Sequence, residues 1–218
     1  MLWASFLQFF YPSRCRSCNI LVTPEEFLCS SCLTQVKPVV SLYIPLTKKH
    51  VLRVYAAGAY QDPLRSMVLK KIGANMLASK QLGRFMVQMI PFQVIPCDIL
   101  VPIPLHWTRY AHRGYNQATE MAKVIGRAVD SPVMQMLTRQ KRTVFQSTLS
   151  GADRQDNVKD VFKIGWHYNM KDAEQFKGKN IVLVDDLYTT GATIKSAARA
   201  LLVYQPKSIT AVVACRAL

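Results

Sequence analysis

Two adjacent carboxylates, Asp185 and Asp186, separate an apolar run from a short loop rich in threonine. The apolar run, residues 181–184, has the composition of a short buried strand, and residues 192–204 have the spacing of a helix. In an open α/β sheet, ligands bind at the carboxyl ends of strands, where the N–H groups that begin the next helix hold phosphate. Carboxylates repel phosphate but suit sugar hydroxyls or a divalent cation. The pattern therefore predicts a sugar-phosphate site, with the phosphate in the loop 189–193.

The loop itself has the residues that a phosphate site needs. Gly191 lets the backbone approach a ligand closely, and the hydroxyls of Thr189, Thr190 and Thr193 add hydrogen-bond donors. An ordinary strand–turn–helix with an acidic tip is the alternative. Phospho-acceptor signalling domains also place acids after a strand, but they lack such a loop directly after the acids. We therefore expect a sugar-phosphate site.

A second group of donors, His106, Arg109 and Arg113, follows the predicted strand 99–102. Two prolines at the end of this strand restrict the backbone to an extended or unusual turn. A loop at a strand end would face the same edge of the sheet as the aspartates. These side chains suit a pyrophosphate or a nucleic-acid phosphate. The alternative is a surface arginine cluster that caps the next helix.

Four of the six cysteines form two Cys-x2-Cys pairs that are ten residues apart: Cys15, Cys18, Cys29 and Cys32. Two such turns can converge into a tetrahedral site of four thiolates, which suits zinc. Four thiolates leave no open position for catalysis, and the segment is too small to bury a core of its own. We therefore expect one structural zinc per chain. Redox or iron–sulfur chemistry and vestigial cysteines are the alternatives.

The composition is that of a folded, basic protein. The chain has 218 residues, 50% of them hydrophobic, and a formal net charge of +15. Such a dispersed excess favours polyanions, including nucleic acid, anionic lipid and phosphorylated ligands, although a solvated basic surface is the alternative. The apolar segment 1–11 is too short to span a bilayer and is a poor signal peptide. We expect this segment to pack on the body as a helix, with a membrane-surface or partner contact as the alternative, and the protein to be cytoplasmic.

Strand and helix patterns alternate from about residue 51 to residue 218, which predicts an α/β fold with a doubly wound parallel sheet. Residues 1–40 are expected to form an apolar N-terminal helix and a zinc module held by the four cysteines. Residues 41–218 are expected to form the α/β domain. Within it, residues 138–160 are polar, charged and poor in periodicity, and loops of this length are commonly functional lids or disordered.

Residues 181–193 resemble the motif of type I phosphoribosyltransferases that binds phosphoribosyl pyrophosphate (PRPP). That motif is a hydrophobic strand, two acids, two hydrophobic residues and a Thr-Thr-Gly-x-Thr-like loop. The chain as a whole resembles the ComF family, phosphoribosyltransferase-fold proteins associated with DNA uptake in natural competence. The resemblance depends on the double Cys-x2-Cys pattern and on residues 59–65, 101–117 and 139–162. One departure is Lys-Lys-Ile-Gly at residues 70–73, where the family usually has a lysine, an aromatic residue and then glycine.

The resemblance implies a role for each motif. Asp185 and Asp186 would bind the ribose hydroxyls of PRPP. Its 5′-phosphate would lie in the loop formed by Thr189, Thr190, Gly191, Ala192 and Thr193. Pyrophosphate and magnesium would bind at residues 101–113. In a transfer reaction Arg109, which would bind PRPP, and Arg113 would stabilise the departing charge together with magnesium. Residues 138–160 would be a flexible flap with four ligand-facing side chains: Arg139, Gln146, Arg154 and Asn157.

Two functions follow from these motifs. The first is a PRPP-binding protein of DNA uptake and natural transformation that handles incoming single-stranded DNA, with the DNA-uptake machinery as partner. The second is a metabolic phosphoribosyltransferase that transfers phosphoribosyl from PRPP to a nucleobase-like acceptor. A purely regulatory or interaction role is a third alternative. The phosphate loop favours a PRPP ligand in either of the first two cases, while the basic charge and the zinc module favour the first.

Overall fold

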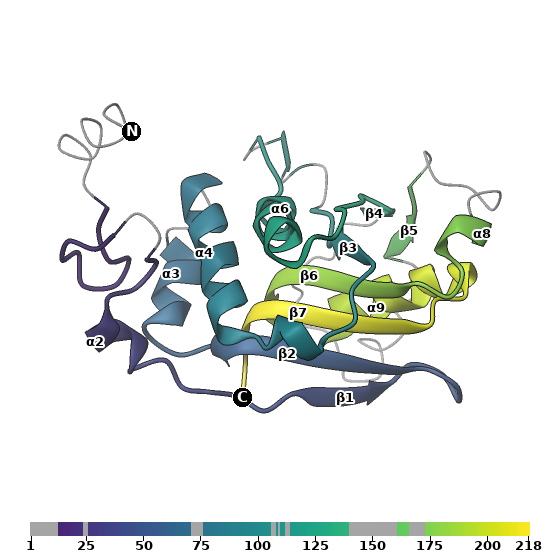
Figure 1. Ribbon diagram of the computed structural model, residues 1–218, viewed down its shortest axis with the longest axis horizontal. Helices are drawn as coiled ribbons and strands as arrows, with labels where there is room; N and C mark the ends of the chain where they lie inside the picture. Colours follow the sequence, from purple (N-terminus) through teal and green to yellow (C-terminus); the bar gives the residue numbers. More distant parts are fainter. Residues whose placement is uncertain are drawn as a thin grey trace, which may run out of the picture.

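Segments of four to nine residues form a five-stranded sheet in the computed structural model (Figure 1). The strand order is β1-β2-β7-β6-β3, with bounds Leu42–Pro45 (β1), Val51–Ala59 (β2), Ile99–Pro102 (β3), Asn180–Tyr188 (β6) and Ser208–Arg216 (β7). The last four strands named are mutually parallel, and β1 is antiparallel to β2. The structure describes residues 13–23, 26–70, 76–105, 108, 110–111, 114–139, 161–165 and 173–218. The N-terminal helix predicted for residues 1–11 lies outside these ranges.

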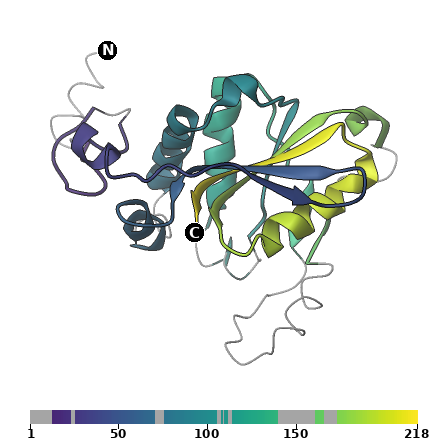
Figure 2. The ribbon, with the colours of Figure 1, turned by 90° about the horizontal axis from the view of Figure 1, so that it is seen from below.

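The sheet has a hydrophobic core on each face, which explains the unbroken apolar runs of its central strands. Residues 181–184 of β6 and 209–214 of β7 are all buried. Helices α4 (Met76–Met89) and α6 (Gln117–Val129) cover one face, and α9 (Ala192–Leu201) covers the other (Figure 2). This three-layer arrangement confirms the predicted α/β fold with helices on both sides of a largely parallel sheet.

Shorter elements complete the described part of the chain. They are α2 (Ser30–Leu33), α3 (Leu64–Lys70), α8 (Ala173–Phe176) and the 3₁₀ turns η1 (Phe92–Val94) and η3 (Leu202–Tyr204). A separate two-stranded antiparallel sheet pairs β4 (Leu137–Arg139) with β5 (Phe162–Ile164). Within the described ranges, no helix is both long and apolar enough to cross a membrane.

Strands β3 and β6 lie side by side, but their connections leave in opposite directions. After β3 the chain passes through α6 and returns at Val133, which bridges to Leu100 on the side of β3 away from β6. After β6 the chain passes through α9 and returns in β7, on the other side of β6. In open α/β sheets, such a reversal leaves a ligand crevice at the carboxyl ends of the two strands. The fold therefore brings the segments after β3 and after β6 to one place.

The cysteine-rich segment packs on helix α4. The ring of Phe27 lies 5.7 Å from that of Phe85, and Arg16 Nε donates a hydrogen bond of 2.8 Å to Gln81 Oε1. Three of the clustered cysteines are buried in the same hydrophobic cluster as Phe85 and the inner faces of α4 and α6. This segment therefore shares its core with the helical layer of the sheet.

Candidate ligand site and metal centre

Asp185 and Asp186 lie within β6, because this strand runs on to Tyr188 and does not end before the acids, as the sequence pattern led us to expect. The pairing with β7 continues through Asp185↔Val213 to Tyr188↔Arg216. On the other side, the pairing with β3 stops at Pro102↔Val184. The acids therefore occupy the part of β6 that has a strand neighbour on one side alone, just beyond the last residue pair of β3 with β6.

The two carboxylates form a coupled pair. The N–H of Asp186 donates a hydrogen bond of 2.9 Å to Asp185 Oδ1, and both side chains are half-buried. Burial, together with the neighbouring charge of Asp186, raises the pKa of Asp185 well above its ordinary value, and the positive charge of Arg139 opposes this shift. Ionising both acids therefore costs free energy in the ligand-free protein. A cation or a set of hydroxyl donors placed between them would recover that free energy.

Arg139 comes to this pair from the two-stranded sheet. It ends β4, and its guanidinium lies over the ring of Phe162 in β5, 5.5 Å from the centroid. Its side chain is half-buried, and its charge lowers the pKa of Asp185. The structure thus brings Arg139, which the family resemblance assigns to the flap, towards the first of the two acids.

The loop after the acids has an enforced backbone turn at Gly191. This residue has a φ of +74°, in the left-handed region that favours glycine, and it stands as the N-cap of α9. A β-carbon here would lie 2.6 Å from Tyr188 Cζ and 2.8 Å from Tyr188 Cε2, so the position also lacks space for a side chain. Thr189 and Thr190 are exposed, and the hydroxyl of Thr190 accepts a hydrogen bond of 3.4 Å from the N–H of Ala192.

Helix α9 begins directly after this turn, at Ala192, and Thr193 is the next residue. The first N–H groups of a helix lack partners within the helix and carry partial positive charge. A phosphate that approaches between the exposed threonines would meet these groups. The five loop residues named from the sequence thus form one continuous turn at the carboxyl end of β6.

The segment after β3 is anchored at both ends beside the acids. The N–H of Ile103 donates to the carbonyl of Val184, 2.9 Å away. Asn116 Nδ2 donates to the carbonyl of Ile103, also at 2.9 Å, while Asn116 Oδ1 caps α6 by accepting from the N–H of Ala118 at 3.1 Å. One side chain therefore closes the loop 103–116 and begins the next helix. Asn116 was not predicted as a site residue, although an asparagine directly before a helix is a typical N-cap signal.

Six of the predicted site residues lie outside the described residues: His106, Arg109, Arg113, Gln146, Arg154 and Asn157. Their roles stay predictions. The same holds for most of the predicted flap, of which only Thr138 and Arg139 are described, both in β4.

Tyr188 and Arg216 are two further residues of this site that sequence reasoning missed. Tyr188 is 8% exposed, and burial raises its pKa, while the charge of Arg216 opposes the shift. Arg216 is itself buried, pairs with Tyr188 across the strands and donates a hydrogen bond of 3.0 Å to the carbonyl of Val40. No local sequence signal could have found this pair, because the register between β6 and β7 creates it.

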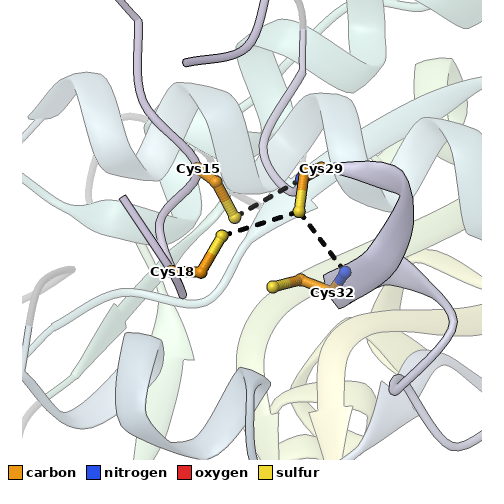
Figure 3. Close-up of side chains that lie close together, drawn as sticks. All are labelled: Cys15, Cys18, Cys29 and Cys32. Atoms are coloured by element: carbon orange, nitrogen blue, oxygen red, sulfur yellow. Dashed lines mark hydrogen bonds between the residues drawn. The ribbon is translucent and has the colours of Figure 1, made fainter. Parts of the chain in front are cut away.

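The four cysteines predicted to bind metal come together at one point (Figure 3). Their sulfur atoms all lie within 4.8 Å of one another, and the Sγ atoms of Cys18 and Cys29 are 3.6 Å apart. A tetrahedral zinc with Zn–S bonds of about 2.3 Å separates its sulfur ligands by about 3.8 Å. Two backbone N–H groups point at sulfur: Cys29 N at Cys15 Sγ and Cys32 N at Cys29 Sγ, each at 3.4 Å.

The protonation of this cluster favours a metal. Burial raises the pKa of Cys15, but the N–H groups of Cys18, Cys29 and Ser17 outweigh it and bring that pKa down to about 6. Burial raises the pKa of Cys32 to about 12. The Cys15 thiolate is thus available at neutral pH, while Cys32 needs a nearby cation to ionise. A set of four sulfur donors in near-tetrahedral reach fits a structural metal such as zinc.

Comparisons with known proteins agree with this geometry. The family model described as Phosphoribosyl transferase domain matches residues 111–218. Competence protein F of Haemophilus influenzae is 33% identical over 105 residues, which are 48% of this chain and 44% of that protein. Competence protein ComFC of Bacillus subtilis is 34% identical over 108 residues, 48% of this chain and 38% of that protein. The chain thus aligns with less than half the length of these two relatives.

A third relative aligns over most of both chains. It is the DNA utilization protein YhgH of Salmonella typhi, 27% identical over 201 residues, which are 87% of this chain and 78% of that protein. An alignment of this extent includes most of the sheet and helices described above.

Proposed function

The chain belongs to the ComF family and has a phosphoribosyltransferase fold, and from this premise we propose that it binds PRPP and handles single-stranded DNA during DNA uptake. The observation that supports PRPP most directly is the carboxylate pair that continues into a glycine-capped phosphate loop at the reversal point of the sheet. Sugar hydroxyls and a phosphate on one ligand match these two features.

In this proposal the ribose hydroxyls of PRPP donate to Asp185 and Asp186. The raised pKa of Asp185 supports this, since burial and the neighbouring charge of Asp186 disfavour its ionised form, which hydroxyl donors would stabilise. The 5′-phosphate lies at the start of α9, in the turn held by Gly191. Magnesium, when bound, would neutralise the pyrophosphate, and residues 101–113 would hold it there.

Phosphoribosyl transfer is the second candidate function, and the same acids favour it. In such a reaction the bond from C1′ to the pyrophosphate oxygen breaks and a bond from C1′ to an acceptor nitrogen forms. The sugar becomes positively charged in the transition state, and carboxylates that hold its hydroxyls also stabilise that charge. Arg113 would stabilise the departing pyrophosphate.

The net charge of the chain and the names of its relatives support the DNA-related part of the proposal. The formal net charge of +15 suits a polyanionic partner. The relatives are named competence proteins and a DNA utilization protein. DNA and the DNA-uptake machinery are therefore the partners that we propose, in the cytoplasm, where incoming DNA would be handled.

Calorimetric titration with PRPP and magnesium tests the ligand. We expect saturable binding that the double variant Asp185→Asn/Asp186→Asn abolishes. The control is Asp130→Asn, which removes an exposed carboxylate at the end of α6, where Asn tolerates the left-handed backbone (φ 50°). Unchanged binding in the double variant would reject the assignment. A pyrophosphate-release assay with a panel of nucleobases then separates transfer, which requires base-dependent release, from binding alone.

A further inference from the structure

The amino-terminal edge of the central sheet carries exposed lysines at the starts of three neighbouring strands. Lys48 and Lys49 lie in the turn before β2, Lys207 directly precedes β7, and Lys179 directly precedes β6. Strands β2, β7 and β6 are consecutive neighbours in the sheet. We call these four lysines the amino-edge strip. In Figure 1 this edge lies at the right-hand end, opposite the cysteine-rich segment.

The backbone that carries the strip is well ordered by hydrogen bonds. Thr47 Oγ1 accepts from the N–H groups of Lys49 and His50, at 3.2 and 3.1 Å, which shapes the turn before β2. The N–H of Lys207 donates to the carbonyl of Lys179 at 2.9 Å. The two parts of the strip are therefore presented on fixed backbone.

A polar network ties together the starts of β3, β6 and β7 beneath the lysines. Asp98 Oδ2 accepts from both the backbone N–H and the side-chain amide of Asn180, at 2.7 and 2.8 Å. Ser208 Oγ donates to Asn180 Oδ1 at 2.8 Å. Asp98, which precedes the outermost strand β3, thus accepts its hydrogen bonds from Asn180 at the β6 end of the strip.

The strip keeps its positive charge in the described part of the chain. The ion pairs found there join Lys80 and Lys123 to Glu120 and Lys177 to Glu174, and none includes a strip lysine. The hydrogen bonds from Asn180 lower the pKa of Asp98 most, and the charges of Lys179 and Lys207 lower it further. This edge thus presents four lysines beside the carboxylate of Asp98, and this excess of positive charge suits an extended polyanion.

An aromatic surface lies at the β1 end of the strip. Tyr43 is 62% exposed and lies opposite Arg53 in the pairing of β1 with β2. This pair is two positions from Pro45↔Val51, the residue pair next to the turn that carries Lys48 and Lys49. The Arg53 guanidinium lies between two rings, 5.0 Å from the centroid of Tyr43 and 4.5 Å from that of Tyr55. Because Tyr55 is buried, this stack holds the exposed Tyr43 ring in place. An exposed, fixed aromatic ring next to cations is the combination that stacks an unpaired base.

We propose that the amino-edge strip and Tyr43 bind single-stranded nucleic acid, with its phosphates on the lysines and one base against the Tyr43 ring. This inference deepens the DNA-handling role proposed above and rests on it. Duplex DNA fits less well, because its bases are already stacked and cannot reach Tyr43. The strip is also separated from the carboxylate site, since Lys179 directly precedes β6 and Asp185 is six residues further along the chain. At a rise of about 3.3 Å per residue, this is roughly 20 Å.

The separation of the two sites sets the first test, which is fluorescence anisotropy of labelled oligothymidylate with and without saturating PRPP and magnesium. Binding should be the same in both conditions and in the Asp185→Asn/Asp186→Asn variant. Competition by PRPP would overturn the proposal, because it would place the DNA at the carboxylate site. Failure of PRPP to bind at all would reject the ligand proposal and leave this one standing.

The second test removes charge from the strip. The variants are Lys179→Gln/Lys207→Gln and Lys48→Gln/Lys49→Gln, and the matched control is Lys37→Gln/Lys80→Gln, two lysines away from this edge. Each lysine that contacts phosphate contributes about 0.7 to the slope of log affinity against log salt, or roughly fivefold in affinity at about 0.1 M salt. We expect the strip variants to bind oligothymidylate more weakly, with a shallower dependence of affinity on salt, by about these amounts per lysine. The control variant should keep the affinity and the salt dependence of the wild type.

Equal losses in the control, or unchanged slopes in the strip variants, would overturn the proposal. Tyr43→Leu keeps an apolar side chain but removes the ring, so it should weaken oligothymidylate binding without changing the salt slope. Equal affinity for a duplex of the same length would overturn the single-strand assignment. The melting temperature of every variant verifies that the fold is retained.

Discussion

The ring of Tyr188 lies against the α-carbon of Gly191, where a β-carbon would stand only 2.6 Å from Tyr188 Cζ. The same glycine has a φ of +74°. Two independent constraints thus act on one residue, a backbone conformation that disfavours side chains and a neighbour that fills the space. Together they fix the turn that begins α9, where we place the phosphate of PRPP.

Replacing Gly191 by alanine should therefore cost more than a change of backbone preference alone. A non-glycine residue in the left-handed region costs about 1–2 kcal/mol, and displacing the Tyr188 ring adds to this. We expect Gly191→Ala to lower the free energy of unfolding in a urea titration by more than about 2 kcal/mol. PRPP binding should be lost as well.

Gly178 provides the matched control. Its φ is +70°, but a β-carbon there would meet nothing within 4 Å. Gly178→Ala should therefore show the backbone cost alone and keep PRPP binding. If Gly191→Ala cost no more than Gly178→Ala, the contact with Tyr188 would have no energetic role. Adding Tyr188→Leu to Gly191→Ala should restore part of the stability, since it removes the ring that the new methyl group meets.

Asp185 should reduce stability at neutral pH. Burial and the charge of Asp186 raise its pKa in the folded protein, so the folded state binds this proton more tightly than the unfolded state does. The favourable contribution of the protonated Asp185 to the free energy of unfolding is fully present below the pKa of the unfolded state, about 3.9. It is lost as the pH rises through the pKa of the folded state. We expect Asp185→Asn to raise the melting temperature at pH 7, with a gain that shrinks as the pH falls towards 4.

Asp98 should have the opposite effect on stability at neutral pH, and it serves as the comparison for Asp185. Hydrogen bonds from Asn180 lower its pKa, so its contribution is present above the unfolded pKa and is lost as the pH falls through the folded value. Asp98→Asn should lower the melting temperature at pH 7, and the difference from wild type should vanish in acid. The same sign of change for both variants at pH 7 would contradict the two opposite shifts.

Local patterns were sufficient to predict much of this fold, and non-local pairing explains what they missed. The apolar run 181–184 and the helix 192–204 were predicted from composition and spacing, and β6, α9 and η3 confirm them. The extension of β6 beyond Val184 was not predicted, because polar residues there are held in the strand by pairing with β7. Strand β1 was missed as well, since it is four residues long, contains Pro45 and pairs only at the sheet edge.

The same distinction holds for the sites. The cysteine cluster was predictable because the spacing alone brings four sulfur atoms together. The contact of Tyr188 with Gly191 and the position of Arg216 depend on a backbone turn and on strand register, which no single segment of the sequence encodes. The role of Asn116 as a helix cap could be predicted from its position before a helix. Its hydrogen bond to Ile103 could not, because the fold brings these two residues together.

Removing the metal should loosen the helical layer as well as the cysteine-rich segment. Phe27 packs on Phe85 of α4, and the cysteines share that hydrophobic cluster. We expect metal analysis to find one zinc per chain and Cys32→Ser to lose it, together with a large fall in melting temperature. Cys97→Ser, outside the cluster, should keep the metal. A wild-type protein that contains no zinc and is as stable in chelator would reject the structural metal.

Asn116 allows its two roles to be separated. Its Oδ1 caps α6 at the N–H of Ala118, and its Nδ2 donates to the carbonyl of Ile103, which closes the loop beside the carboxylates. Asn116→Ala removes both interactions and should lower the free energy of unfolding by about 1–2 kcal/mol, the usual cost of a lost cap and a buried carbonyl without its donor. Asn116→Asp keeps the cap but has no donor for Ile103. We therefore expect Asn116→Asp to preserve the helicity of α6, measured by amide hydrogen exchange, while weakening PRPP binding measured by calorimetry. Full PRPP affinity in Asn116→Asp would mean that the bond to Ile103 does not position the ligand loop.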